Sequence, residues 1–284
     1  MSGENMTGRI VALTGASSGL GRVAAFRLAA MGAHLVLVAR NRAKGETLLQ
    51  QLRAQHPGLD AKLLIADLSS LADIRRLAVE LPKAAPRIDV LINNAGAIFT
   101  QRETSVDGLE RTFALNHMAY FLLTLLLLDR LKSGGHARIV NVASEAHRNA
   151  RLDFNDLQTA QGYSGWLAYR RSKLANILFT RELARRLAGT GVTANCLHPG
   201  FVATEFGNNN GGAFRAALSV AKRFMAISPQ QGGETLVYAA SAKEIAGMSG
   251  VYFDKNRPRA PSEAAQDDDA AKRLWTMSEK LAGL

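Results

Sequence analysis

The sequence predicts an α/β protein in which a parallel sheet carries helices on both faces. Short apolar, β-branched runs alternate with longer amphipathic stretches from one end of the chain to the other. Runs such as Leu35–Val38 are apolar without interruption, which is typical of strands covered on both sides. No internal repeat or low-complexity linker breaks this alternation, so we expect one domain of 284 residues.

The individual elements follow from the period of the apolar residues. The clearest amphipathic helices are Leu20–Met31, Ala43–Gln55 and Ser172–Ala188. The apolar run Ala119–Leu128 is shorter than the roughly 20 residues that span a bilayer, so we expect a buried helix there. The candidate strands are Arg9–Thr14, His34–Ala39, Lys62–Ala66, Val90–Asn93, Arg138–Ala143, Thr193–Leu197 and Val251–Phe253.

Composition and charge exclude several classes of protein. The 35 Lys and Arg exceed the 24 Asp and Glu by 11, but the basic residues are spread along the chain and form no long run, which argues against nucleic-acid binding. The single cysteine, Cys196, rules out an internal disulfide and a cysteine-based metal site, and it favours a reducing compartment. The first residues, Met1–Gly8, are polar and unlike a signal peptide. We therefore expect a soluble cytoplasmic protein without a membrane span or a metal.

A glycine-rich turn follows the first predicted strand and leads directly into a helix. It reads Thr14-Gly15-Ala16-Ser17-Ser18-Gly19-Leu20-Gly21. Glycines allow the backbone to turn tightly and to approach a pyrophosphate, and the following helix offers it free N–H groups and the positive end of its dipole. An ordinary strand-to-helix connection is the alternative, but the position of the turn within a βαβ unit favours dinucleotide binding. We expect contacts with the cofactor from Gly15, Ser17, Ser18, Gly19, Leu20 and Gly21.

Three further turns lie where strands of the predicted sheet end. Arg40-Asn41-Arg42 follows the second strand, where an acidic residue in NAD-binding proteins holds the ribose hydroxyl and a basic residue instead accommodates a 2′-phosphate. The sequence therefore predicts NADP(H) over NAD(H), with Arg40 as the main phosphate ligand and Ser17 or Arg42 as helpers. Asp67-Leu68 and Asn94-Ala95-Gly96 follow the third and fourth strands, at the edge where open parallel sheets bind ligands. Turn formation alone would also explain both.

Tyr169 and Lys173 stand four residues apart and share one face of a helix. The phenol has a reference pKa of about 10, and a neighbouring ammonium lowers that pKa toward the range useful for acid–base work. A surface pair is the alternative interpretation. The upstream glycine-rich turn, and Ser144 at the end of a strand, favour a catalytic group.

These motifs together resemble the short-chain dehydrogenase/reductase family over nearly the whole chain. Tyr169-Arg170-Arg171-Ser172-Lys173 is similar to its Tyr-x-x-x-Lys motif, and Asn93–Gly96 to its structural turn. The stretch Ser172–Gly200 and the tail Arg273–Leu284 resemble more narrowly the retinol dehydrogenase-like branch. The resemblance implies a Rossmann-type doubly wound sheet of about seven parallel strands. It also implies a homodimer or homotetramer, in which helices around Ala119–Leu131 and Tyr169–Leu187 would pair, and the excess apolar surface of Ala119–Leu128 supports that expectation.

The resemblance also implies a role for each site residue. Tyr169 would be the general acid–base, Ser144 would bind the substrate oxygen, and Lys173 would lower the pKa of Tyr169 and hold the nicotinamide ribose. Asn116 matches the asparagine that kinks a helix and anchors a proton-relay water. Four further residues match the segment around the nicotinamide, namely Pro199, Gly200, Val202 and Thr204.

The expected activity is therefore the NADP(H)-dependent interconversion of a small hydrophobic carbonyl compound and its alcohol. We expect residues 201–227, with the Asn- and Gly-rich stretch Asn208–Gly212 and a helix over Phe214–Ile227, to form a lid that closes over the substrate. Membrane-bound retinol dehydrogenases usually carry an N-terminal apolar anchor, which this sequence lacks, and this favours a soluble relative with another substrate. The alternatives are a regulator that binds NADP(H) without turnover and a retinoid or lipid reductase acting at a membrane surface.

Overall fold

A single sheet organises the chain, and its strand order is β3-β2-β1-β4-β5-β6-β7-β8. The computed structural model describes residues 5–200 and 229–284. Strands β1 to β7 run parallel, while β8 pairs antiparallel with β7. The strands are β1 Ile10–Thr14, β2 His34–Ala39, β3 Ala61–Ile65, β4 Val90–Asn93, β5 Arg138–Val142, β6 Thr193–His198, β7 Tyr252–Asp254 and β8 Arg257–Pro258.

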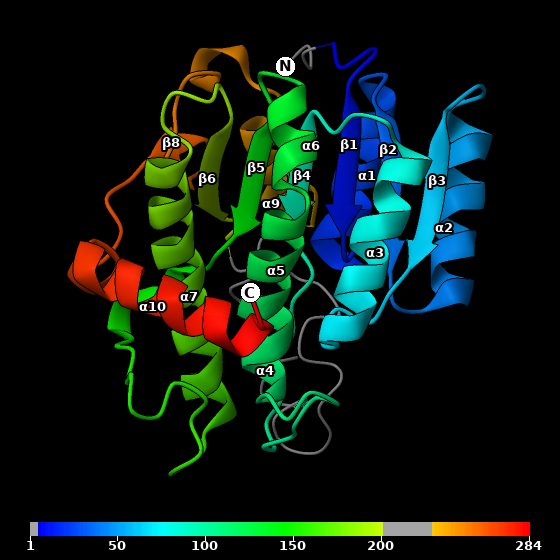
Figure 1. Ribbon diagram of the computed structural model, residues 1–284. Helices are drawn as coiled ribbons and strands as arrows, with labels where there is room; N and C mark the ends of the chain where they lie inside the picture. The colour runs from blue at the N-terminus through cyan, green and yellow to red at the C-terminus, as the bar shows by residue number, and fades with distance from the viewer. Residues whose placement is uncertain (1–4, 201–228) are drawn as a thin grey trace.

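Helices cover both faces of this sheet, as the uninterrupted apolar strands predict (Figure 1). One face carries α1 Gly19–Ala30, α2 Arg42–Gln55 and α9 Pro229–Ser241. The other face carries α3 Leu71–Ala84, α4 Arg111–Phe113, the π-helical turn η1 Ala114–Met118, α5 Ala119–Leu126, α6 Leu128–Ser133, α7 Gly165–Arg186 and α10 Asp268–Ala282. Short 3₁₀ turns are η2 Glu145–Asn149, η3 Lys243–Ile245 and η4 Glu263–Ala265. This is a doubly wound α/β fold, and its strand order reverses direction between β1 and β4, where ligands of such sheets bind.

The seven predicted strands are all present, and one short strand was not predicted. β8 is formed by Arg257 and Pro258 alone, which is too short to leave a periodic pattern. It returns along β7 through the two-residue turn Lys255-Asn256, whose φ angles of 49° and 61° are those of a tight hairpin. Helix α7 begins at Gly165, before the amphipathic stretch Ser172–Ala188, and so includes Tyr169 as the spacing of Tyr169 and Lys173 predicts.

The structure divides the apolar helix predicted over Ala119–Leu128 at Leu127 into α5 and α6, and most of it is buried within the chain itself. The ring of Phe121 contacts Phe179 of α7 at 5.5 Å and Trp275 of α10 at 5.1 Å between centroids. Figure 1 shows α10 crossing in front of α7 toward α5. The Arg186 guanidinium lies 4.1 Å from the centre of the Trp275 ring and closes the cluster from outside. Most of the apolar surface that suggested a partner subunit is therefore covered within the chain, by α3 and α10, while Leu125, Leu126 and Leu128 are half-buried. The homodimer or homotetramer stays a prediction.

Candidate active site

The glycine-rich turn after β1 packs too closely for side chains at two positions. Gly15 has a φ of 65°, and a Cβ there would lie 2.8 Å from the Cα of Ala95. A Cβ on Gly21 would lie 2.2 Å from the carbonyl oxygen of Gly15. Asn94 holds the turn from β4, since its Nδ2 donates to the carbonyl oxygen of Thr14 at 2.8 Å. The turn and the loop after β4 are therefore packed together, and the Asn94 side chain links them by its hydrogen bond to Thr14.

The N-terminus of α1 faces the same edge of the sheet and is suited to an anion. Its N-cap, Ser18, is exposed and makes no side-chain capping hydrogen bond, and the first turn carries no acidic residue. The first N–H groups of a helix need partners, and the helix dipole places positive charge there. With Ser17, Gly19 and Leu20 around it, this end of α1 fits a pyrophosphate.

The structure separates the two arginines that follow β2. Arg40 is exposed and forms no ion pair with any residue in the described part of the chain. Arg42 instead pairs with Glu46 at 3.6 Å on α2, and the Asn41 side chain caps α2 by accepting from the Lys44 N–H. Arg40 is therefore the residue available to a phosphate group.

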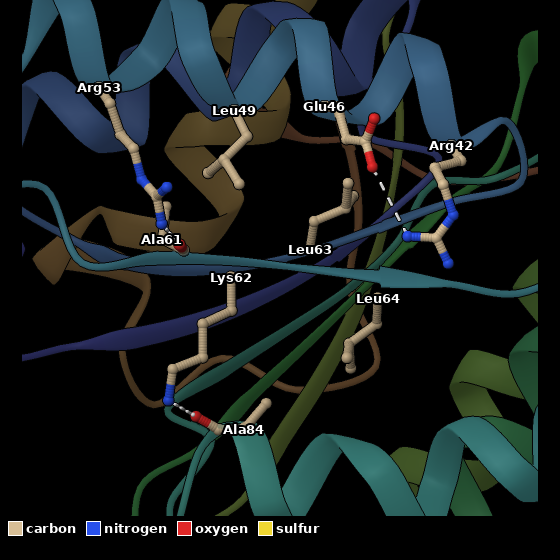
Figure 2. A pocket seen from close by; sticks show the side chains of 9 residues that line it. All are labelled: Arg42, Glu46, Leu49, Arg53, Ala61, Lys62, Leu63, Leu64 and Ala84. Carbon is tan, nitrogen blue, oxygen red and sulfur yellow. Dashed lines mark hydrogen bonds and ion pairs between the residues drawn. The ribbon is translucent and has the colours of Figure 1, made fainter.

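Arg42 lines a groove of about 440 Å³ between α2 and the edge strand β3 (Figure 2). The basic side chains of this groove already have partners. Arg53 donates to the carbonyl oxygen of Ala61 at 2.9 Å, and Lys62 donates to the carbonyl oxygen of Ala84 at 2.5 Å. The groove is thus a feature of the sheet edge, and none of the predicted catalytic residues lines it.

The turn after β3 is held by its own side chains. One carboxylate oxygen of Asp67 accepts hydrogen bonds from the N–H and the hydroxyl of Ser69, at 2.9 and 2.7 Å. The side chain of Leu68 is buried in the core. Local turn formation accounts for the Asp67 contacts that the structure shows.

Asn116 sits in the π-helical turn η1, which is the helix irregularity that the resemblance implies. Its Oδ1 accepts from the Ala97 N–H, and its Nδ2 donates to the Ala97 carbonyl oxygen and to Ser172 Oγ, at 2.9, 2.9 and 3.0 Å. A Cβ on Gly96 would lie 3.1 Å from Asn116 Oδ1 and 3.5 Å from Lys173 Nζ. Asn116 therefore ties the loop after β4 to α7, beside Lys173. Ser172 was missed by the sequence analysis, although its place next to Lys173 is a signal that could have found it.

Tyr169, Ser144 and Lys173 meet at the carboxyl end of β5. Ser144 lies two residues after that strand, as the N-cap of η2, and its side chain hydrogen-bonds with the hydroxyl of Tyr169 on α7. Lys173 lies one turn further along α7, with Nζ 5.7 Å from the centre of the Tyr169 ring. Its Nζ donates to the Val142 carbonyl oxygen at 2.8 Å. The sequence prediction that these side chains share one site agrees with this geometry.

Burial sets the pKa values of this group. Burial raises the pKa of Tyr169 to about 12, against a smaller lowering by the hydrogen bond with Ser144. Burial also lowers the pKa of Lys173 to about 7, because the side chain is only 3% exposed. The expected lowering of the Tyr169 pKa by Lys173 is therefore not found: desolvation dominates, and the opposing contribution comes from Ser144. Both groups therefore tend toward their neutral forms near neutral pH.

Two histidines hold the turn that follows Ser144. His147 Nδ1 lies 2.6 Å from the Ser144 carbonyl oxygen and donates to it, while its Nε2 accepts from the Ser262 N–H at 3.1 Å. His198 Nδ1 accepts from the Glu145 N–H at 3.1 Å. Burial lowers the pKa of both rings, which agrees with the neutral forms that these bonds require. The histidines position Ser144, and no group of side chains within residues 5–200 and 229–284 could hold a metal ion.

The remaining predicted contacts fall at the end of β6. Pro199 and Gly200 follow this strand at the carboxyl edge, on the same side as Ser144. Val202, Thr204 and the expected lid 201–227 lie outside the described residues. Cys196 is buried in β6, as expected for a core residue. Among the described helices, none is long and apolar enough to cross a membrane.

Comparison with known proteins gives consistent results. Residues 9–213 match the family model of the short chain dehydrogenases. Human "Retinol dehydrogenase 13" is 39% identical, with 100% of this chain and 87% of the relative aligned. Mouse "Retinol dehydrogenase 14" is 41% identical, with 98% and 87% aligned.

Solved structures show the same fold. An uncharacterised protein from Mycobacterium paratuberculosis has a TM-score of 0.80 and 33% identity, with 99% of this chain and 96% of that chain covered. The NADP complex of RhlG from Pseudomonas aeruginosa has a TM-score of 0.70 and 28% identity, covering 88% and 95%.

A doubly wound sheet with a glycine-rich turn at its switch point and a Ser–Tyr–Lys group beside it defines a nicotinamide-dependent oxidoreductase. The chain belongs to the short-chain dehydrogenase/reductase family and is similar to its retinol dehydrogenases. It is therefore an oxidoreductase of the class that interconverts carbonyl compounds and alcohols.

Proposed function

We propose that the protein is an NADP(H)-dependent oxidoreductase that interconverts a hydrophobic aldehyde or ketone and the corresponding alcohol. The hydrogen-bonded pair of Ser144 and Tyr169, with Lys173 behind it, is the observation that carries the proposal. Two hydroxyl groups converging at the end of a strand bind a carbonyl oxygen, and one of them is able to exchange a proton with it.

Each residue has a defined task in this scheme. Ser144 and Tyr169 donate hydrogen bonds to the carbonyl oxygen, and Tyr169 gives it the proton that completes the alcohol. In the reverse direction Tyr169 removes that proton. Lys173 favours the tyrosinate left behind whenever its amine is protonated. Asn116 fixes the loop after β4 against α7 and so keeps Lys173 in place. When bound, the nicotinamide cofactor supplies or accepts the hydride.

The preference for NADP(H) is supported by Arg40. Its guanidinium is exposed beside the end of β2 and forms no ion pair with the described residues, whereas an acidic side chain there would repel a 2′-phosphate. The uncapped end of α1 and the tight packing at Gly15 and Gly21 fit the pyrophosphate of the same molecule. We therefore keep the cofactor contacts predicted from the sequence for this region, with Arg40 rather than Arg42 as the main ligand of the 2′-phosphate.

The retinol dehydrogenase relatives favour a second candidate, a retinoid or lipid reductase acting at a membrane surface. The net charge of +11 would attract such a protein to anionic lipids. Co-sedimentation with anionic liposomes at moderate salt distinguishes it from the soluble cytoplasmic enzyme that we favour. A regulator without turnover is less consistent with the assembled group of Asn116, Ser144, Tyr169 and Lys173, which binding alone does not require.

The test is NADPH oxidation with a panel of aldehydes and ketones that includes retinaldehyde. Tyr169→Phe removes the proton donor and should lower kcat by at least about a hundredfold while NADPH still binds. Tyr238→Phe, which changes a tyrosine on α9 outside the site, is the matched control and should keep wild-type activity. Turnover that persists in Tyr169→Phe, or tighter binding of NADH than of NADPH, would contradict the proposal.

A further inference from the structure

Trp166 extends the aromatic surface of the catalytic tyrosine toward the solvent. It lies in the first turn of α7, three residues before Tyr169 and on the same face of the helix. The two rings are stacked, with centroids 5.7 Å apart and planes inclined by 25°. The indole is nevertheless 51% exposed, and no other aromatic residue is among the exposed large hydrophobic side chains of the described chain.

The backbone around Trp166 is held firmly. A Cβ on Gly165 would lie 2.2 Å from the carbonyl oxygen of Phe99, so the start of α7 touches that loop directly. The Tyr163 hydroxyl donates to the Phe99 carbonyl oxygen at 2.8 Å and lies 3.2 Å from Glu110 Oε1, and Glu110 is buried. The indole is thus presented by a fixed piece of backbone, which reduces the entropy lost when a ligand stacks on it.

A purely structural role, in which Trp166 covers the Tyr169 ring, would explain the stacked face of the indole. It would not explain why half of the indole is exposed. A single exposed apolar residue is common on protein surfaces, but this one lies against the residue that exchanges the proton. A substrate whose carbonyl oxygen contacts the hydroxyls of Ser144 and Tyr169 has its carbon skeleton close to the first turn of α7. A flat π-system attached to that carbonyl is the group that an indole binds best.

We propose that Trp166 is a specificity-determining residue that stacks against the planar aromatic or conjugated part of the substrate. This inference rests on the proposed function, because it assumes a carbonyl oxygen at Ser144 and Tyr169. It predicts that planar conjugated carbonyl compounds are preferred over saturated ones of similar size.

Binding is tested first, without turnover. The chain has two tryptophans, and the other one, Trp275 of α10, is buried against α5 and α7, so Trp275→Phe leaves Trp166 as the only indole. In the presence of NADP⁺, 2-naphthaldehyde should quench this fluorescence saturably, whereas decanal should not. Trp166→Phe, which keeps Trp275, corrects for light absorbed by the aldehyde, and circular dichroism verifies that both variants are folded.

Kinetics provide the second test. Trp166→Ala should lower kcat/KM for 2-naphthaldehyde about tenfold and change that for decanal less than about threefold, while Trp166→Phe keeps most of the activity. Met248→Ala removes another exposed apolar side chain, in the loop before β7 at the opposite edge of the sheet, and should change neither substrate. Unchanged or equal losses for the two aldehydes would overturn the assignment. Quenching of Trp166 in a protein that turns over no carbonyl compound would support the stacking site and refute the proposed function instead.

Discussion

Lys173→Met should make the protein inactive and more stable. Lys173 is buried, and burial lowers its pKa from 10.5 to about 7, so the folded state bears the cost of a desolvated ammonium whenever the amine is protonated. Methionine has a similar length and no charge. The Val142 carbonyl oxygen that Lys173 contacts would keep its second donor, Asn176 Nδ2, at 3.2 Å. The replacement therefore leaves no unsatisfied buried group at this carbonyl.

The lowered pKa sets the size of the effect. A fall from 10.5 to about 7, at 1.36 kcal/mol per pH unit, gives a ceiling of about 5 kcal/mol for the stability gained by removing the charge. The hydrogen bond to Val142 offsets part of this, because bonds from charged donors contribute about 1.5–3 kcal/mol. We expect the variant to be more stable than the wild type by about 2 kcal/mol at pH 6.

The pH dependence gives the sharper test. Between pH 7 and 10.5 the unfolded wild-type chain binds the Lys173 proton and the folded one releases it, so wild-type stability rises with pH through this window. The advantage of Lys173→Met should thus be largest below pH 7 and should shrink to less than half at pH 9. Urea unfolding of both proteins at pH 6 and pH 9 measures it.

The control is Lys83→Met, which removes an exposed lysine from α3 and should shift stability by no more than about 0.5 kcal/mol at either pH. A Lys173→Met protein that is less stable than the wild type at pH 6, or whose advantage is the same at both pH values, would refute the reasoning. Loss of NADPH oxidation in the more stable variant would show that the lysine is kept for chemistry.

Four further outcomes are expected. Arg40→Ser should weaken NADPH binding roughly 10- to 100-fold and change NADH binding little. Arg42→Ser should weaken NADPH binding much less, because Arg42 pairs with Glu46. Equal losses of NADPH affinity in fluorescence titrations of the two variants would contradict the role of Arg40 as the main phosphate ligand. Gly21→Ala should weaken NADPH binding at least about tenfold because its Cβ meets the Gly15 carbonyl oxygen, whereas Gly247→Ala, with open space around it, should bind normally. Trp275→Ala should cost about 3–5 kcal/mol in denaturant unfolding, and a loss below 1 kcal/mol would mean that α10 does not close this core. Light scattering at micromolar concentration tests the homodimer or homotetramer, which a single monomer peak would disprove.

The sequence alone was sufficient where neighbours along the chain decide the outcome. The seven predicted strands follow from apolar runs. The turn containing Gly15 and Gly21 follows from its glycines, because no other residue fits sterically at these two positions. Tyr169 and Lys173 share a face because they are four residues apart on one helix. Asn116 was named through resemblance and Ser144 took its role from it, since nothing local to either residue indicates what it contacts.

Tertiary structure decided what depends on distant parts of the chain. The packing of Trp275 of α10 on Phe121 of α5 covered part of a helix whose apolar surface had suggested a partner subunit. The direction of the Tyr169 pKa shift was also decided there, because burial of the phenol raises its pKa. A helical or β period depends on residues a few positions apart, whereas burial depends on every segment that packs around a group, so periodicity predicted the elements and only the folded chain determined their surroundings.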